Sequence, residues 1–139
     1  MHLNLQTIKK LPDAVRIPEY DRDNLSAGII HIGLGNFHRA HMAWYSHRLM
    51  DQGIAHNWAI LGAGVRSLDD VNRTKILEQD CFTTLIKLDP SGKSAEVIGS
   101  MIDYIPVEKN NASLIQHLIK PNIRIVSLTV TEGGYYQTP

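Results

Sequence analysis

Several features are scarce in this sequence, and each scarcity excludes a class of protein. The only cysteine is Cys81, so no internal disulfide or multi-cysteine metal site can form, and a packed thiol in a reducing, cytoplasmic compartment is expected. No charge of one sign dominates, because 14 basic residues balance 14 acidic ones, which argues against nucleic acid or an anionic membrane as partner. A run of about 20 apolar residues, as a membrane span needs, is missing, and the N-terminus has no export signal. We therefore expect a soluble protein that binds a small molecule.

Hydrophobic patterning predicts that strands and helices alternate along a chain with the length of one domain. Residues 29–32 form a short apolar run between glycines, typical of a strand buried on both faces, and residues 37–52 have helical length before Gly53. Residues 58–61 form a second such run. Ser67 and Asp70 then form a possible capping box for a helix that continues to about Leu77.

The second half of the chain continues this alternation after one interruption. Residues 81–99 predict two strands joined by a turn at Asp89-Pro-Ser-Gly92. Residues 112–119 have helical spacing up to Pro121, and residues 123–131 form the longest β-branched run. We therefore predict an α/β fold with a doubly wound, mostly parallel sheet of the Rossmann type, and with the strand pair around residues 81–99 inserted into it.

A glycine turn follows the first predicted strand. Gly33 and Gly35 occupy the first two places of the dinucleotide-binding fingerprint, which permit a tight turn and a close approach of the backbone to a pyrophosphate. His38 replaces the third glycine, but the strand before the turn and the helix after it supply the context that the motif requires. The alternative is a plain glycine turn with a solvated arginine. The candidate cofactor contacts here are Gly33, Gly35, Asn36, Phe37, His38 and Arg39.

The same helix carries three histidines, which raises the question of a metal site. His38 and His41 are three residues apart and can share a face, and His47 follows. No carboxylate or cysteine lies among them, and a histidine at a helix start more often packs or forms hydrogen bonds. We expect no metal at this site.

The choice of cofactor depends on residues that follow the second predicted strand. An acidic side chain there would bond the ribose 2′-hydroxyl of NAD, whereas an arginine would attract the 2′-phosphate of NADP. Asp69 is the candidate for the first role and Arg66 for the second. An equally good interpretation of Asp69 is that it stabilises the start of its helix. NAD is the expected cofactor, and NADP remains open.

In residues 33–41 the glycine turn continues with Phe-His-Arg-Ala-His, and in residues 127–135 the last β-branched run leads into Thr-Glu-Gly-Gly-Tyr. Both segments resemble the mannitol dehydrogenase family of polyol-specific long-chain dehydrogenases, which has this variant glycine turn and this strand continuation. The resemblance implies hydride transfer without zinc between NAD(H) and a secondary alcohol or its ketone, with mannitol and fructose as the leading pair. It also implies that Asp69 sets NAD preference, although Leu68 departs from the glutamate that often precedes that residue. Ser127, Thr131 and Glu132 match positions near the cofactor.

The resemblance further implies which parts are missing. The family's catalytic lysine and its supporting residues belong to a helical substrate domain beyond Pro139, so we name no catalytic residue and expect this chain alone to be inactive. The expected organisation is an extended surface arm over residues 1–27 and an incomplete dinucleotide-binding domain over residues 28–139, without the C-terminal domain that binds the polyol or ketose. The alternatives are a hexuronate (fructuronate) reductase fragment and a free-standing, non-catalytic nucleotide-binding module.

Overall fold

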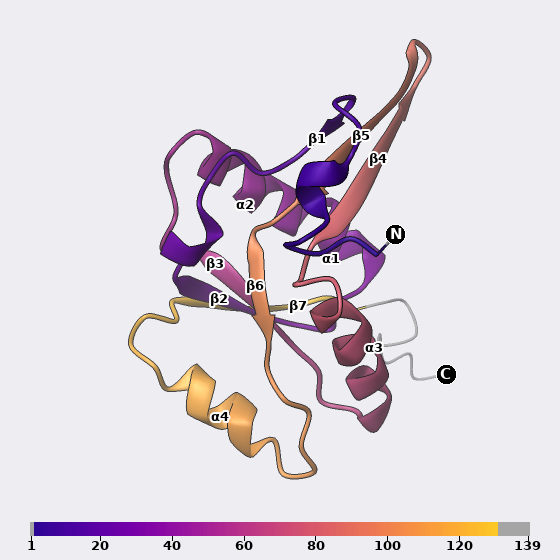
Figure 1. Cartoon of the computed structure of the whole chain (residues 1–139). Coiled ribbons are helices and arrows are strands. Elements are labelled where there is room, and N and C mark those ends of the chain that lie inside the picture. Colours follow the sequence, from indigo (N-terminus) through magenta and orange to yellow (C-terminus); the bar gives the residue numbers. More distant parts are fainter. Residues whose placement is uncertain (1, 131–139) are drawn as a thin grey trace, which may run out of the picture.

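A computed structural model of the chain describes residues 2–130 and contains two sheets. Figure 1 shows a central sheet flanked by helices and a β-hairpin that extends away from it. In chain order the elements are η1 (Ile8–Lys10), β1 (Val15–Arg16), η2 (Arg22–Asn24), β2 (Ala27–Ile32), α1 (Asn36–Ala40), α2 (Met42–Asp51), β3 (Ala59–Ala63), α3 (Ser67–Leu77), β4 (Thr83–Asp89), β5 (Gly92–Ile98), β6 (Met101–Tyr104), α4 (Ala112–Leu118) and β7 (Ile125–Leu128).

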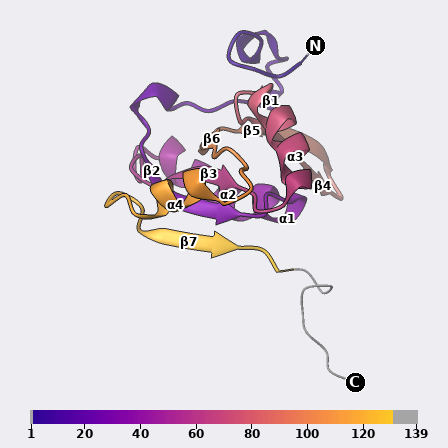
Figure 2. The ribbon, with the colours of Figure 1, turned by 90° about the horizontal axis from the view of Figure 1, so that it is seen from below.

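The central sheet is parallel and has the strand order β6-β3-β2-β7. Strand β2, the first strand of this sheet along the chain, pairs with β3 on one side and with β7 on the other, so the order reverses beside β2. Strand β7 lies at the edge of the sheet (Figure 2). This arrangement confirms the predicted mostly parallel, doubly wound sheet, whose ligands bind where the order reverses.

Alternate residues of the central strands face two separate hydrophobic clusters. Ile29 and Ile60 pack in a cluster with residues of α2, α3 and β6. Their neighbours Ile30 and Leu61 pack in a second cluster that includes Leu114 of α4. Because both faces of β2 and β3 are covered, continuous apolar runs suit these strands better than an alternating pattern. No helix within residues 2–130 is long and apolar enough to cross a membrane.

The strand pair predicted around residues 81–99 is confirmed. Strands β4 and β5 are antiparallel, and Asp89 pairs with Gly92 at the turn, where Gly92 has a φ of +143°. Asp89 accepts a hydrogen bond from the Ser91 backbone N–H at 2.8 Å, which stabilises the turn.

The N-terminal segment is more structured than the expected extended arm. Val15 and Arg16 form β1, which pairs in parallel with β5 and makes the hairpin a three-stranded sheet. Ile8 is buried against Phe82 and Val97 in a third hydrophobic cluster. The segment is therefore less extended than predicted, because its apolar residues pack against the hairpin, although Ile8 is the only buried residue among residues 2–27.

Three further elements differ from the predictions. The helix expected over residues 37–52 is two helices, because His41 has a non-helical backbone (φ −118°, ψ −85°). The N-cap of the next helix is Arg66 and not the expected Ser67, so this helix begins one residue earlier than predicted. Among the described residues 123–130, strand β7 covers only Ile125–Leu128. Just before it, the Arg124 guanidinium stacks on the Trp58 ring at 3.4 Å.

Candidate functional site

The glycine turn connects β2 to α1 at the edge of the sheet where the strands end. Gly33 has a φ of +88°, a left-handed conformation that glycine adopts without the strain of a side chain. Its N–H donates to the Ala63 carbonyl of β3 at 2.9 Å, and the Gly35 N–H donates to the Gly33 carbonyl at 2.8 Å. The turn is therefore held tightly against the sheet.

Gly35 is the N-cap of α1 and leaves its backbone open. A Cβ added to Gly35 would meet no atom within 4 Å, unlike one added to Gly28, Gly62, Gly64 or Gly99. The first N–H groups of α1 have no acceptor within the helix. An anionic group can therefore come close to this backbone, as the second glycine of a dinucleotide turn requires.

A cavity of about 430 Å³ lies beside this turn. It reaches from the end of β2 to the end of β7, which are the two strands where the sheet order reverses. Its lining consists of the turn, the segment after β3 and the ends of two strands: Ile32, Gly33, Leu34, Gly35, Val65, Arg66, Asp69, Asn72, Tyr104, Leu128, Thr129 and Val130. This is the place that the fold rule assigns to a nucleotide ligand.

Sequence reasoning missed several of these lining residues, among them Tyr104 and Thr129. Tyr104 is the last residue of β6, and Thr129 follows β7. Their position at the ends of strands is the signal that could have identified them. The Tyr104 ring is buried beneath the cavity against Gly62, and burial, with Asp69 nearby, raises the pKa of Tyr104 to about 12. Tyr104 therefore stays a neutral phenol below that pH.

Asp69 is in the cavity wall, but its carboxylate points inward. The side chain is buried, and its Oδ2 accepts hydrogen bonds from the backbone N–H groups of Val65 (3.0 Å) and Arg66 (2.9 Å). Its Oδ1 lies 3.5 Å from the Arg66 guanidinium. A Cβ on Gly64 would lie 2.3 Å from the Asp69 Cβ, so glycine at that position lets the aspartate pack on the backbone. Asp69 thus stabilises the start of α3 and also forms part of the cavity wall.

Other predicted cofactor contacts lie elsewhere. Phe37 is largely exposed, stacks on His41 and does not line the cavity. Ser127 faces away from it, with its hydroxyl 2.9 Å from His31 Nδ1. Asn36 and Arg39 line a neighbouring cavity between α1 and α3. Thr131 and Glu132 fall outside the described residues.

His38, predicted as a cofactor contact, is buried and stacked on another histidine. Its ring lies parallel to that of His31 with centroids 3.5 Å apart, and neither ring nitrogen has a hydrogen-bond partner among the described residues. Burial, with His31 and Arg39 nearby, lowers the pKa of His38 to about 3. Burial also lowers the pKa of His31, whose nitrogens lie within hydrogen-bond distance of Ser127 and Thr129. With both pKa values lowered, the two stacked rings are neutral at pH 7.

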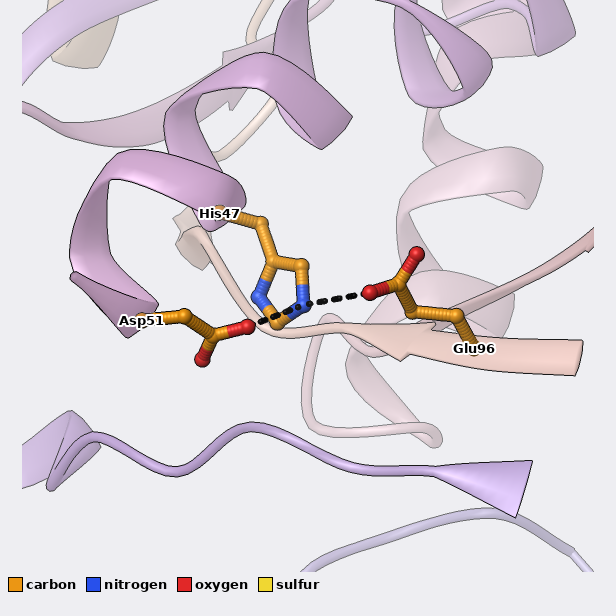
Figure 3. A group of neighbouring side chains, drawn as sticks. All are labelled: His47, Asp51 and Glu96. Atoms are coloured by element: carbon orange, nitrogen blue, oxygen red, sulfur yellow. Dashed lines mark ion pairs between the residues drawn. The ribbon is translucent and has the colours of Figure 1, made fainter. Parts of the chain in front are cut away.

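A second cluster of polar side chains joins α2 to the hairpin. Figure 3 shows the His47 ring between Asp51, on its own helix, and Glu96 of β5. His47 Nε2 lies 3.3 Å from Asp51 Oδ2 and 3.7 Å from Glu96 Oε1, and Nδ1 lies 2.8 Å from the Tyr20 hydroxyl. Sequence reasoning found no carboxylate near these histidines. The structure brings two to His47: Asp51, four residues further along the chain, and Glu96 from the distant strand β5.

The chemistry of Glu96 is that of an ion-pair centre rather than a metal ligand. Its oxygens lie 2.8 Å from Arg16, 3.2 Å from Arg48 and 3.4 Å from Lys87, and the Trp44 indole N–H donates at 2.8 Å. Burial would raise the pKa of the Glu96 carboxyl, but the Trp44 hydrogen bond and the cations of Arg16 and Lys87 outweigh burial and hold that pKa below its usual value. A metal ion would have to displace several cations.

Comparison with known proteins agrees with this geometry. The family model described as "Mannitol dehydrogenase Rossmann domain" matches residues 27–139. Mannitol 2-dehydrogenase from Cereibacter sphaeroides is 54% identical over 123 residues, which are 88% of this chain and 26% of that protein. Polyol:NADP oxidoreductase from Gluconobacter oxydans is 41% identical over 133 residues, which are 94% of this chain and 27% of that protein.

A solved structure gives the same result in three dimensions. The chain superimposes on Pseudomonas fluorescens mannitol 2-dehydrogenase, solved as a ternary complex with NAD and D-mannitol, with a TM-score of 0.89 and 43% identity. The match covers 96% of this chain and 27% of that one. This chain thus spans about a quarter of the length of these relatives. Because the family model matches most of the chain, including the glycine turn and the central sheet described above, this chain belongs to the mannitol dehydrogenase family and carries its Rossmann domain.

Proposed function

We propose that this chain binds NAD and forms the cofactor-binding part of a polyol dehydrogenase. The observation that carries the proposal is the open glycine turn at the point where the sheet order reverses, with a cavity running from it to the end of β7. Gly33 and Gly35 would hold the pyrophosphate, because their backbone leaves room for it. The residues present therefore fit the cofactor.

The remaining cavity walls would contact the other parts of the dinucleotide, which are the adenosine ribose and the nicotinamide half. Arg66 and Asp69, which follow β3, would border the adenosine ribose. Thr129 and Val130, which follow β7, would border the nicotinamide half. When bound, NAD supplies the site that accepts or donates a hydride. Thr129 is held in place by His31, whose Nε2 lies 3.2 Å from its hydroxyl.

The reaction proposed for the longer protein is hydride transfer between NAD(H) and a secondary alcohol or its ketone, such as mannitol and fructose. What supports it is membership of a family whose relatives carry mannitol and polyol dehydrogenase names. None of the residues assigned to the cavity is proposed as the general base, so the chain by itself is expected to bind cofactor without turnover. A cytoplasmic location also stays a prediction, supported by the single buried thiol of Cys81.

Two assays separate the parts of this proposal. Calorimetric titration of the chain with NADH tests cofactor binding, and saturable one-to-one binding is expected. Joining the chain to a substrate domain of family length and adding mannitol and NAD tests the chemistry, with production of NADH expected. Binding without turnover in the joined protein, with mannitol, arabinitol and hexuronates all tried, would leave a nucleotide-binding module and refute the dehydrogenase.

A further inference from the structure

Two buried histidines flank the glycine turn along the chain. His31 precedes the turn in β2, and His38 follows it in α1. Their exposed fractions are 3% and 2%, and their rings stack with centroids 3.5 Å apart and an interplanar angle of 12°. The turn lies within residues 32–37, the short segment between these two side chains. Helix α1 therefore cannot shift relative to β2 without separating or sliding two rings that are in van der Waals contact.

His31 also fixes β2 to the neighbouring strand β7. Its Nδ1 lies 2.9 Å from the Ser127 hydroxyl, and its Nε2 lies 3.2 Å from the Thr129 hydroxyl. Because a neutral imidazole has one donor and one acceptor nitrogen, the two hydroxyls use both and hold the ring in one orientation. Thr129 lines the cavity assigned to NAD, whereas neither histidine belongs to the described lining. The stacked pair thus connects α1 to β2 and β7 from outside the cavity.

His38 forms no hydrogen bond through its ring within the described part of the chain. Both ring nitrogens are buried without a partner among residues 2–130, which costs stability compared with an apolar ring of the same shape. Stacking on His31 is the contact that the structure does show. In the usual fingerprint this position is a glycine, whose missing side chain lets the helix pack closely on the strand. Here an imidazole fills that space, so the ring stack sets the separation of α1 from β2.

We propose that His38 is a positioning residue for the cofactor: by stacking on His31, it fixes the glycine turn in the conformation that receives the pyrophosphate. It thereby takes over the task of the third glycine in the usual fingerprint. The proposal rests on the proposed function, because the turn must hold a pyrophosphate for its conformation to matter. Without the His38 ring the turn is less ordered in the free protein, so binding has to order it and the affinity falls.

The first test compares the Kd of ADP-ribose, measured by calorimetry, for the unchanged chain, His38→Ala and His38→Phe. ADP-ribose contains the pyrophosphate without the nicotinamide, so it reports on the glycine turn. We expect His38→Ala to raise the Kd about 5- to 50-fold, the range expected when binding must order a short segment. His38→Phe keeps a planar ring against His31 and should recover most of this loss. Urea unfolding of the same samples shows that each variant is folded.

The second test uses two serine variants that alter neither ring. Each removes a hydroxyl that bonds inside the protein: the Ser127 hydroxyl lies beside His31 Nδ1, and the Ser100 hydroxyl donates to the Ala43 carbonyl at 2.6 Å. Neither serine is in the described lining of the cavities beside the turn. Ser127→Ala should raise the Kd of ADP-ribose about 2- to 5-fold, because it frees one side of the His31 ring. Ser100→Ala, the matched control, should lower stability and leave the Kd unchanged.

The outcomes separate this proposal from the proposed function. Equal Kd values for His38→Ala and the unchanged chain, or a loss that His38→Phe does not recover, overturn the positioning role and leave cofactor binding intact. Binding of neither ADP-ribose nor NADH by the unchanged chain overturns both proposals. If His38→Ala does not fold, the serine pair decides: a loss of affinity in Ser127→Ala alone supports the positioning role, and equal responses of the two variants overturn it.

Discussion

Gly35→Ala separates cofactor binding from folding more cleanly than any other glycine substitution in the described part of the chain. Gly35 has a φ of −89° and a ψ of 177°, which alanine adopts freely, and its added methyl group meets no protein atom within 4 Å. The methyl group instead occupies space beside the turn that the pyrophosphate would use. We therefore expect binding to weaken in a protein that is still folded.

The magnitudes follow from two separate effects. Alanine is a poorer N-cap than glycine, but it also lowers the conformational entropy of the unfolded chain, so stability should change by less than about 0.5 kcal/mol. In the complex the methyl group overpacks a close contact, which costs about 1–3 kcal/mol and raises the Kd of NADH roughly 5- to 150-fold.

Calorimetric titration with NADH and urea unfolding of the same samples measure both quantities. Gly53→Ala is the opposite control, because Gly53 has a φ of +77°, open space around it and no place in either cavity. It should lose about 1–2 kcal/mol of stability and bind NADH normally. A Gly35→Ala chain that binds NADH as tightly as the unchanged chain would refute the assignment of the pyrophosphate to this turn.

Three further predictions concern the residues that support the site. The folded-state pKa of His38, about 3, lies below the usual value of 6.5, so the contribution of His38 to stability is complete above about pH 6.5 and falls toward pH 3. The free energy of unfolding should therefore decrease by about 2 kcal/mol between pH 7 and pH 5 because of this residue. In urea unfolding, His38→Phe should lack this part of the pH dependence. Asp69→Ala removes the acceptor for two backbone N–H groups, so urea unfolding should show a loss of about 1–2 kcal/mol; an unchanged midpoint would contradict the capping role. Glu96→Gln leaves three cations facing a neutral amide, and because these cations are partly exposed we expect a loss of about 1–3 kcal/mol, measured by thermal melting. Glu19→Gln, at an exposed position outside the helices and strands, should not cause this loss.

Local sequence was enough to predict the elements that bury continuous apolar runs. Strands β2 and β3 are covered on both faces, so a continuous run of hydrophobic residues predicts each strand even when its neighbours in the sheet are unknown. The hairpin turn at Asp89 to Gly92 was equally predictable, because turn residues favour one backbone conformation locally. The glycine turn combined both signals: a buried strand, then Gly33 and Gly35.

Elements that depend on distant partners were not predictable in this way. Strand β6 has only four residues and includes the polar Asp103, so it becomes a strand by pairing with β3. Strand β1 exists because β5 lies beside it. The break at His41 arises within a sequence of good helical length, and its ring bonds the Phe37 carbonyl at 2.8 Å. The two strands thus depend on tertiary contacts that outweigh local propensity, whereas the contact seen at the break is a local one.

The candidate site shows the same division. Gly33 and Gly35, predicted from the motif, and Arg66 and Asp69, predicted because they follow the second strand, all line the cavity. His38 stands where the fingerprint has a glycine, and the sequence gives no sign that a second ring, that of His31, lies against it. The remaining walls come from strand ends whose order in the sheet must be known first.

The most direct test of cofactor binding at the glycine turn is a map of backbone amide NMR shifts during titration of the ¹⁵N-labelled chain with NADH. We predict saturable shifts at Gly33 and Gly35, at Val65 and Arg66 after β3, and at Thr129 after β7, all with one Kd. Shifts confined to other surfaces, or no saturable change at the two glycines, would contradict the central claim that this turn holds the dinucleotide.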